Sequence, residues 1–179
     1  MPSGMNCWRS SASEIMSEII DIYNAAGVKT GQALRSEAHG NNDLLHHAAH
    51  VLVFSSDGRL LLQKRAANKR IQPGKWDASV GGHLAAGEDF ISGARRELAE
   101  ELGLPEDSEL EFLFDVQIRN EIESEDARVF KTVSDGPFDF QKEEIDEVRF
   151  FTISELKDPE WRKNFTPCLN GELDRIYGE

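Results

Sequence analysis

The chain has 179 residues, with 20 basic against 33 acidic side chains, which gives a formal net charge of −13. This length suits one domain with a sizeable core. Hydrophobic residues make up 39% and charged residues 30%, a composition typical of a globular protein rather than a disordered one. Such an acidic chain is repelled by phosphate backbones and anionic lipids, so neither nucleic acid nor a membrane is an expected partner. The carboxylates are either dispersed as solvated surface or gathered around metal ions.

The cysteines and the N-terminal segment indicate a reducing, cytoplasmic setting. Cys7 and Cys168 stand near opposite ends of the chain, so no disulfide framework is expected. No apolar run approaches the roughly 20 residues that a membrane span needs. Residues 1–13 lack the apolar run of a signal peptide. We expect residues 1–16 to form a flexible extension and residues 17–179 to form one domain.

In chain order, the first patterns are those of short strands. Weak strand patterns at 18–23 and 28–34 flank an Asn-Ala-Ala-Gly turn. An apolar run, a Ser-Ser-Asp-Gly turn and three consecutive leucines then predict a hairpin over 48–65. Further strands are expected at 77–84, 110–118, 128–133 and 148–152, a short helix near 154–156, and a helix over 168–177. This order predicts a mixed α/β (α+β) domain.

The clearest helical pattern covers residues 90–102. Its apolar residues recur at three- and four-residue spacing and predict a core-facing stripe: Ile91, Ala94, Leu98 and Leu102. Gly103 is suited to a C-terminal cap, and Pro105 blocks continuation of the helix.

Three glutamates of this helix share one face. Glu97, Glu100 and Glu101 are spaced i, i+3 and i+4, which predicts that they project together, opposite the apolar stripe. They are either a solvated acidic face or oxygen ligands for a hard divalent cation such as Mg²⁺. The double glycine at 81–82, just before the helix, favours a ligand role.

The segment from Gly82 to Leu104 resembles the Nudix signature. It reads GHLAAGEDFISGARRELAEELGL, which matches Gly, five residues, Glu, seven residues, Arg-Glu, an aliphatic, any residue, Glu-Glu, any residue, Gly and an aliphatic. This resemblance implies a Nudix fold, with a mixed β-sheet sandwiched between α-helices. It also implies metal-dependent hydrolysis of a small organic or nucleoside diphosphate.

The resemblance also implies roles for single residues. The ligands of Mg²⁺ or Mn²⁺ would be Glu97, Glu100, Glu101 and the Gly82 carbonyl. Glu88 and Arg96 would pair charges and orient the glutamates. A group must also take a proton from the attacking water. The candidate base is Glu144, just before the strand at 148–152, with Glu97 as the second candidate.

A longer part of the chain resembles the Nudix-fold group related to isopentenyl-diphosphate isomerase, notably residues 58–65, 73–76 and 82–83. The isomerase holds a metal through three His and two Glu. The matching positions here are His39, His46, His83, Glu123 and Glu125. Imidazole ligands would suit Mn or Zn better than Mg. The competing interpretation is coincidental histidines beside a solvated hairpin tip.

Two departures from the isomerase pattern concern its chemistry. Its catalytic cysteine aligns with Gly81, and its cation-stabilising tryptophan aligns with Cys168. Isomerisation by that mechanism is therefore not expected, and the complete Nudix signature favours hydrolysis. An isomerase-like enzyme with altered catalytic residues and a diphosphate-binding module without turnover stay open as alternatives.

A basic cluster stands out against the acidic background: Lys64, Arg65, Lys69, Arg70 and Lys75. By resemblance, Arg65 and Lys69 match diphosphate-contacting positions, and so does Arg35. Lys75 would complete a cationic rim that draws in an anionic substrate. Ordinary solvated surface is the competing interpretation. Trp76, beside this cluster, is expected in the core.

Overall fold

A computed structural model describes residues 18–178. The extension expected over residues 1–16 lies outside the described residues. In chain order the elements are β1 (Ile19–Tyr23), β2 (Lys29–Leu34), α2 (Arg35–Ala38), β3 (His46–Phe54), β4 (Leu60–Arg65), β5 (Trp76–Asp77), β6 (Val80–His83), α3 (Phe90–Leu102), β7 (Glu111–Arg119), β8 (Ser124–Val133), β9 (Ile145–Phe151), α4 (Ile153–Lys157), α5 (Pro159–Arg162) and α6 (Pro167–Tyr177). No helix within the described range combines the length and apolarity needed to cross a membrane.

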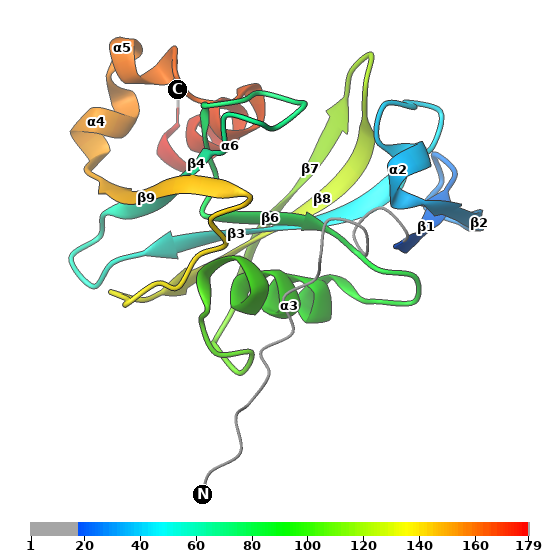
Figure 1. The fold of residues 1–179 in the computed structure, drawn as a ribbon, viewed down its shortest axis with the longest axis horizontal. Helices are drawn as coiled ribbons and strands as arrows, with labels where there is room; N and C mark the ends of the chain where they lie inside the picture. Colours follow the sequence, from blue (N-terminus) through cyan, green and yellow to red (C-terminus); the bar gives the residue numbers. More distant parts are fainter. Residues whose placement is uncertain (1–17, 179) are drawn as a thin grey trace, which may run out of the picture.

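A seven-stranded mixed sheet forms the centre of the fold (Figure 1). Its main path runs β5-β4-β3-β8-β7, with β6 paired to β3 and β9 paired to β4. The β3–β8 pair is parallel, while the other pairs of this sheet are antiparallel. A separate β1–β2 hairpin stands beside it.

Helices cover both faces of this sheet, as the Nudix resemblance implied (Figure 1). Val51 and Val53 of β3 pack with Ala94, Leu98 and Leu102 of α3 in one core. Leu52 points the other way and packs with Leu169 and Leu173 of α6 in a second core. A strand buried on both faces needs a nearly continuous apolar run, and residues 48–54 of the sequence supply it.

The helix α3 has the bounds that the sequence predicts. The Asp89 side chain accepts a hydrogen bond from the Ser92 amide at the N-cap, and Gly103 adopts a left-handed conformation at the C-cap, with φ of 67°. The expectation that Ile91 faces the core is wrong, because Ile91 is 38% exposed. Phe90 supplies the first turn's core contact instead, and its ring stacks on His47 at 4.8 Å.

Several strand limits differ from the expected ones. β8 begins at Ser124 rather than at 128, so Glu125 lies within a buried strand instead of a solvated hairpin tip. β9 begins at Ile145, directly after Glu144. The strand expected over 77–84 is divided into β5 and β6.

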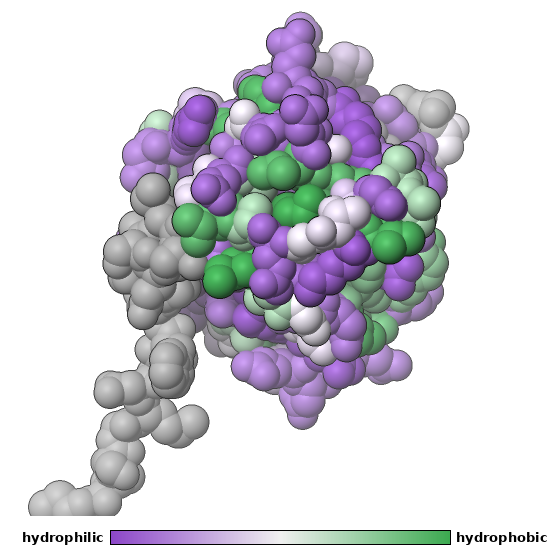
Figure 2. Space-filling view, turned by 90° about the vertical axis from the view of Figure 1, so that its right-hand side faces the viewer, coloured by the Kyte–Doolittle hydropathy of each residue, from purple (hydrophilic) through white to green (hydrophobic). Residues whose placement is uncertain are grey.

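Some of the excess acidic residues are exposed on the surface, as the sequence suggested. The exposed carboxylates here include Glu106, Asp107, Glu109 and Glu111. Figure 2 shows the side of the molecule that carries β1, β2 and α2, where hydrophilic residues surround separate apolar patches. Ile19 of β1 and Leu34 of β2 are exposed.

Candidate functional site

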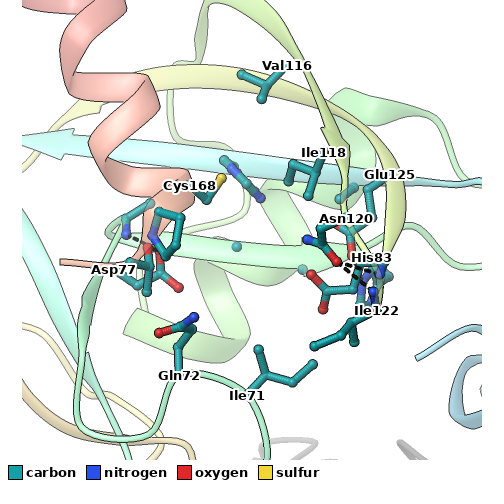
Figure 3. A pocket seen from close by; sticks show the side chains of 18 of the residues that line it. Ile71, Gln72, Asp77, His83, Val116, Ile118, Asn120, Ile122, Glu125 and Cys168 are labelled. Carbon is teal, nitrogen blue, oxygen red and sulfur yellow. Dashed lines mark hydrogen bonds and ion pairs between the residues drawn. The ribbon is translucent and has the colours of Figure 1, made fainter. Parts of the chain in front are cut away.

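A cavity of about 850 Å³ lies among β3, β4, β6, β8 and the start of α6. Figure 3 shows Ile71, Val116, Ile118 and Ile122 around it. Polar groups gather on its opposite sides, with His83 and Glu125 on one and Asp77 and Cys168 on the other.

Glu101 reaches this cavity through a gap in the sheet. β3 pairs with β4 at Phe54↔Leu60 and with β6 along Ala48–Val51, so β4 and β6 separate from each other. The carboxylate of Glu101 enters between them, where its Oε2 accepts from Gln63 Nε2 at 2.9 Å and from the Gly81 amide at 3.4 Å. A residue of α3 thereby lines a cavity on the far side of the sheet.

Glu97 packs against Gly82. Glu97 is 6% exposed, and a Cβ built on Gly82 would lie 2.1 Å from its carboxylate, so any side chain at position 82 would displace that carboxylate. The expectation that the glutamates lie opposite the apolar stripe is therefore wrong for Glu97 and Glu101. At 100° per residue they border Ala94 and Leu98, and they face β6 rather than solvent.

One guanidinium group holds three of the carboxylates. Arg96 donates to Glu97 Oε1 at 2.8 Å, to Glu100 Oε2 at 3.2 Å and to Glu88 Oε1 at 2.9 Å. It also donates to the His83 carbonyl at 3.0 Å, which ties α3 to β6. These contacts fix the glutamate side chains relative to the strand that lines the cavity.

Burial makes ionisation of these carboxylates unfavourable. It raises the pKa of Glu101 to about 8, and the negative charge of Glu97 adds to the shift. Burial also raises the pKa of Glu97, although Arg96 opposes that shift. Adjacent carboxylates with raised pKa values, beside a close-fitting glycine, fit a hard divalent cation, whose charge would favour their ionised forms.

A second cluster of polar side chains is brought together by the register of the strands. The parallel β3–β8 pair sets His46 beside Glu125, and the β3–β6 pair sets His83 beside Ala48. His83 Nε2 lies 2.8 Å from Glu125 Oε1 and 3.3 Å from His39 Nε2. The possible ligand atoms of His39, His83 and Glu125 all lie within 4.8 Å of one another.

His46 borders the same group. Its Nδ1 donates to the Leu44 carbonyl at 2.8 Å, while its buried Nε2 has no hydrogen-bond partner among the described residues and lies 3.3 Å from Glu125 Oε1. Burial opposes ionisation of Glu125, but His83 and His46 hold its pKa well below the usual range. Glu123 lines the cavity without joining the compact group. A buried imidazole nitrogen without a hydrogen bond, 3.3 Å from a carboxylate oxygen, fits Mn or Zn.

Three of the four basic candidates line the cavity, namely Arg35, Arg65 and Lys69. Lys69 forms an ion pair with Glu144, and burial together with the charge of Arg65 lowers its pKa to about 8. Lys75 is not among the lining residues, because its ammonium donates to the Lys163 carbonyl at 2.6 Å. Trp76 is 6% exposed and packs on Phe151 in the core, as expected.

The sequence interpretation missed a third polar cluster. His50, Cys168 and Glu172 converge where α6 meets β3. Cys168 and Glu172 are spaced i, i+4 in the predicted C-terminal helix, which was the available signal. Their contact with His50 depends on tertiary packing that local patterns do not encode. Burial raises the pKa of the Cys168 thiol to about 11.

Known proteins resemble this chain in sequence and in fold. A family model described as the NUDIX domain matches residues 44–169. An uncharacterized Nudix hydrolase of Yersinia pestis is 36% identical over 175 residues, covering 90% of this chain and 91% of its own. An isopentenyl-diphosphate Delta-isomerase of Clavibacter sepedonicus is 30% identical over 171 residues, covering 90% and 89%. A Deinococcus radiodurans crystal structure matches with a TM-score of 0.76 at 23% identity, covering 89% of this chain and 99% of that one.

Proposed function

This chain belongs to the Nudix family, and on that premise we propose that it hydrolyses a phosphoanhydride bond of a small organic or nucleoside diphosphate. Water would attack phosphorus with the help of Mg²⁺ or Mn²⁺. The observation that carries this proposal is the pair of Glu97 and Glu101, two adjacent carboxylates with raised pKa values, of which Glu101 lines the cavity. We assign this activity to one domain over residues 17–179.

The glutamate face of α3 would hold the cation. Its ligands would be Glu97, Glu100, Glu101 and the Gly82 carbonyl. A bound cation of this kind neutralises phosphate oxygens and lowers the pKa of a bound water. Arg96 and Glu88 would position the ligands, because the Arg96 guanidinium contacts Glu88, Glu97 and Glu100 at once.

Side chains around the cavity would bind the substrate and accept the proton. Arg35, Arg65 and Lys69 would bind the anionic diphosphate, since they bring positive charge to its wall. Glu144 would accept the proton of the attacking water as Lys69 turns to the substrate. Glu144 lines the cavity, whereas Glu97 is not among the lining residues, which favours Glu144 as the base.

We also propose a second metal position at the histidine cluster. His39, His46, His83 and Glu125 would hold Mn or Zn, with Glu123 at its edge. The buried His46 Nε2 supports this assignment, because it has no hydrogen-bond partner among residues 18–178 and lies 3.3 Å from Glu125 Oε1. An ion there would occupy the end of the cavity away from Cys168 (Figure 3).

Activity assays across substrate classes test the hydrolysis proposal. Purified protein with Mg²⁺ or Mn²⁺ should release phosphate or monophosphate products from at least one of nucleotide sugars, dinucleoside polyphosphates, nucleoside triphosphates or prenyl diphosphates. Glu101→Gln should reduce kcat by at least about 100-fold, since it removes charge stabilisation worth several kcal/mol. Glu106→Gln, at an exposed glutamate, is the matched control and should leave kcat unchanged.

A second candidate function is favoured by the histidine cluster and by the relative named as an isopentenyl-diphosphate Delta-isomerase. An isomerase-like reaction transfers protons at carbon, so it would exchange deuterium from D₂O into isopentenyl diphosphate. No exchange would remove this candidate. Tight diphosphate binding with neither exchange nor hydrolysis would instead indicate a binding module without turnover.

A further inference from the structure

A cluster of three different metal-ligating groups stands apart from both sites described above. Cys168 and Glu172 project from one face of α6, and His50 meets them from β3. His50 Nδ1 lies 2.5 Å from Glu172 Oε1, and Cys168 Sγ lies 3.7 Å from the same oxygen. All three possible ligand atoms fall within 4.8 Å of one another. The i, i+4 spacing on a helix is one that places two ligands on a single ion.

Glu172 supplies a second, independent observation. Its side chain is buried, with the residue 1% exposed, and its Oε2 has no hydrogen-bond partner within the described part of the chain. A buried carboxylate oxygen is costly unless a donor or a cation satisfies it. Glu172 Oε1 already pairs with His50, so Oε2 is the oxygen that a metal ion would satisfy.

The neighbourhood leaves one side of the cluster open. His50 and Cys168 both line the cavity, and Figure 3 shows Cys168 across from His83 and Glu125. Gly81 lies beside the imidazole, and a Cβ there would come within 3.2 Å of His50 Cδ2. The glycine thus leaves the His50 ring edge uncovered toward the cavity.

We propose that His50, Cys168 and Glu172 form a transition-metal site, suited to Zn²⁺, with an open position facing the cavity. One sulfur, one nitrogen and one carboxylate oxygen are a Zn²⁺ ligand set, unlike the all-oxygen set on α3 that suits Mg²⁺. Three protein ligands with a vacant fourth position are the arrangement of zinc sites that bind a water or a substrate group. This site does not depend on the hydrolysis proposal, and a separate experiment tests it.

Cobalt titration tests the site, because a thiolate bound to Co²⁺ gives an intense charge-transfer absorption in the near ultraviolet. The full chain is titrated with Co²⁺ alone, as wild type, Cys168→Ser, His50→Asn and Cys7→Ser. Cys7→Ser is the matched control, since Cys7 is the only other cysteine. The histidine cluster around His83 contains no thiol and cannot produce this band.

The band should saturate in the wild type and in Cys7→Ser at the absorbance of one thiolate-bound Co²⁺ per chain, whatever Co²⁺ the other two proposed sites take up, and it should be absent in Cys168→Ser. His50→Asn should weaken Co²⁺ binding at least tenfold, and Zn²⁺ should displace Co²⁺ and bleach the band. Each variant should keep a cooperative metal-free melting transition, which separates lost ligation from misfolding, although His50→Asn should melt lower because it removes the partner of the buried Glu172. The proposal is overturned if the wild type gives no band, or if Cys168→Ser keeps it. Loss of the band in Cys7→Ser would also overturn it.

Discussion

Glu101 occupies a position where its own charge is poorly tolerated. Its pKa rises from an ordinary value near 4.5 to about 8, because burial and the adjacent Glu97 both oppose ionisation. The folded protein therefore binds more protons here than the unfolded chain between those pH values. Metal-free stability should fall as pH rises from about 4.5 to 8.

Replacing that charge tests the pH dependence. Glu101→Gln should raise the metal-free melting temperature at pH 8 by at least about 2–4 °C, corresponding to about 1 kcal/mol, and should change it little at pH 4.5. Differential scanning calorimetry in a chelator at both pH values measures this difference. Glu106→Gln is the control, and equal shifts at both pH values would count against the assignment.

Gly82 is a second residue at the site, and Glu97 occupies the space where a side chain at this position would lie. Gly82→Ala would push a methyl group into the Glu97 carboxylate, since the Cβ would lie 2.1 Å from it. We expect destabilisation of about 1–3 kcal/mol, as for other overpacked sites, together with loss of activity. Urea unfolding measures the change in free energy.

Gly171→Ala provides the matched control for that experiment. Gly171 lies within α6, and a Cβ there would meet no atom within 4 Å. Alanine should be neutral or stabilise the helix by up to about 1 kcal/mol. An equal decrease in the free energy of unfolding in both variants would show that the close approach of Gly82 to Glu97 does not cause the destabilisation.

At the scale of elements, α3 connects the sheet core to the site. Its apolar stripe packs on β3 while Arg96 gathers the glutamates on the adjoining side. Mutation of a residue that orients metal ligands commonly lowers metal affinity or activity by about 10–100-fold. Arg96→Lys should therefore lower kcat/KM by about 10–100-fold, with partial recovery at high Mg²⁺.

The neighbouring Arg95 gives a control on the same helix. Arg95→Lys should leave the Mg²⁺ dependence of kcat/KM unchanged, because within residues 18–178 the ion pairs to Glu88, Glu97 and Glu100 come from Arg96 and not from Arg95. Steady-state kinetics across a Mg²⁺ series compares the two variants. A similar loss in both would assign the effect to the helix rather than to the Arg96 contacts.

Local patterns foretold some elements and not others. The bounds of α3 followed from apolar spacing, Asp89 and Gly103, because these signals lie within one segment. The juxtaposition of His46 with Glu125 depends on parallel pairing of β3 with β8, which lie far apart in the sequence. Resemblance to a family supplied that pair, whereas residue spacing alone could not.

The same limit explains the third cluster and the misplaced residues. Cys168 and Glu172 share a predicted helix, but nothing local links them to His50. Lys75 belonged to a basic run in sequence, yet its side chain turns to the Lys163 carbonyl. Side chains that are neighbours on a loop can point in different directions. The run of basic residues therefore predicted more cationic side chains at the cavity than the structure places there.

At the scale of the whole molecule, the charge of −13 is unevenly placed. Several carboxylates gather around one cavity, including Glu101, Glu123, Glu125 and Glu144. Without cations this wall would repel a diphosphate, despite Arg35, Arg65 and Lys69. Binding of an anionic ligand should therefore depend on divalent metal.

Calorimetry with methylenediphosphonate, which resists hydrolysis, tests that dependence. Its affinity should increase at least tenfold when Mg²⁺ replaces Na⁺ at constant ionic strength, which removes general screening as the cause. Equal affinity in both salts would mean that the basic residues alone hold the phosphates.

Water attack on phosphorus at the α3 glutamates predicts which product carries the solvent oxygen, and reaction in H₂¹⁸O measures this. With Mg²⁺ and a hydrolysed diphosphate, mass spectrometry should find one ¹⁸O in a phosphate product of the wild type, and Glu101→Gln should form that product at least about 100-fold more slowly. Glu106→Gln should match the wild type. Turnover that places no ¹⁸O on phosphorus, or that continues at the wild-type rate in Glu101→Gln, would contradict water attack on phosphorus at these glutamates.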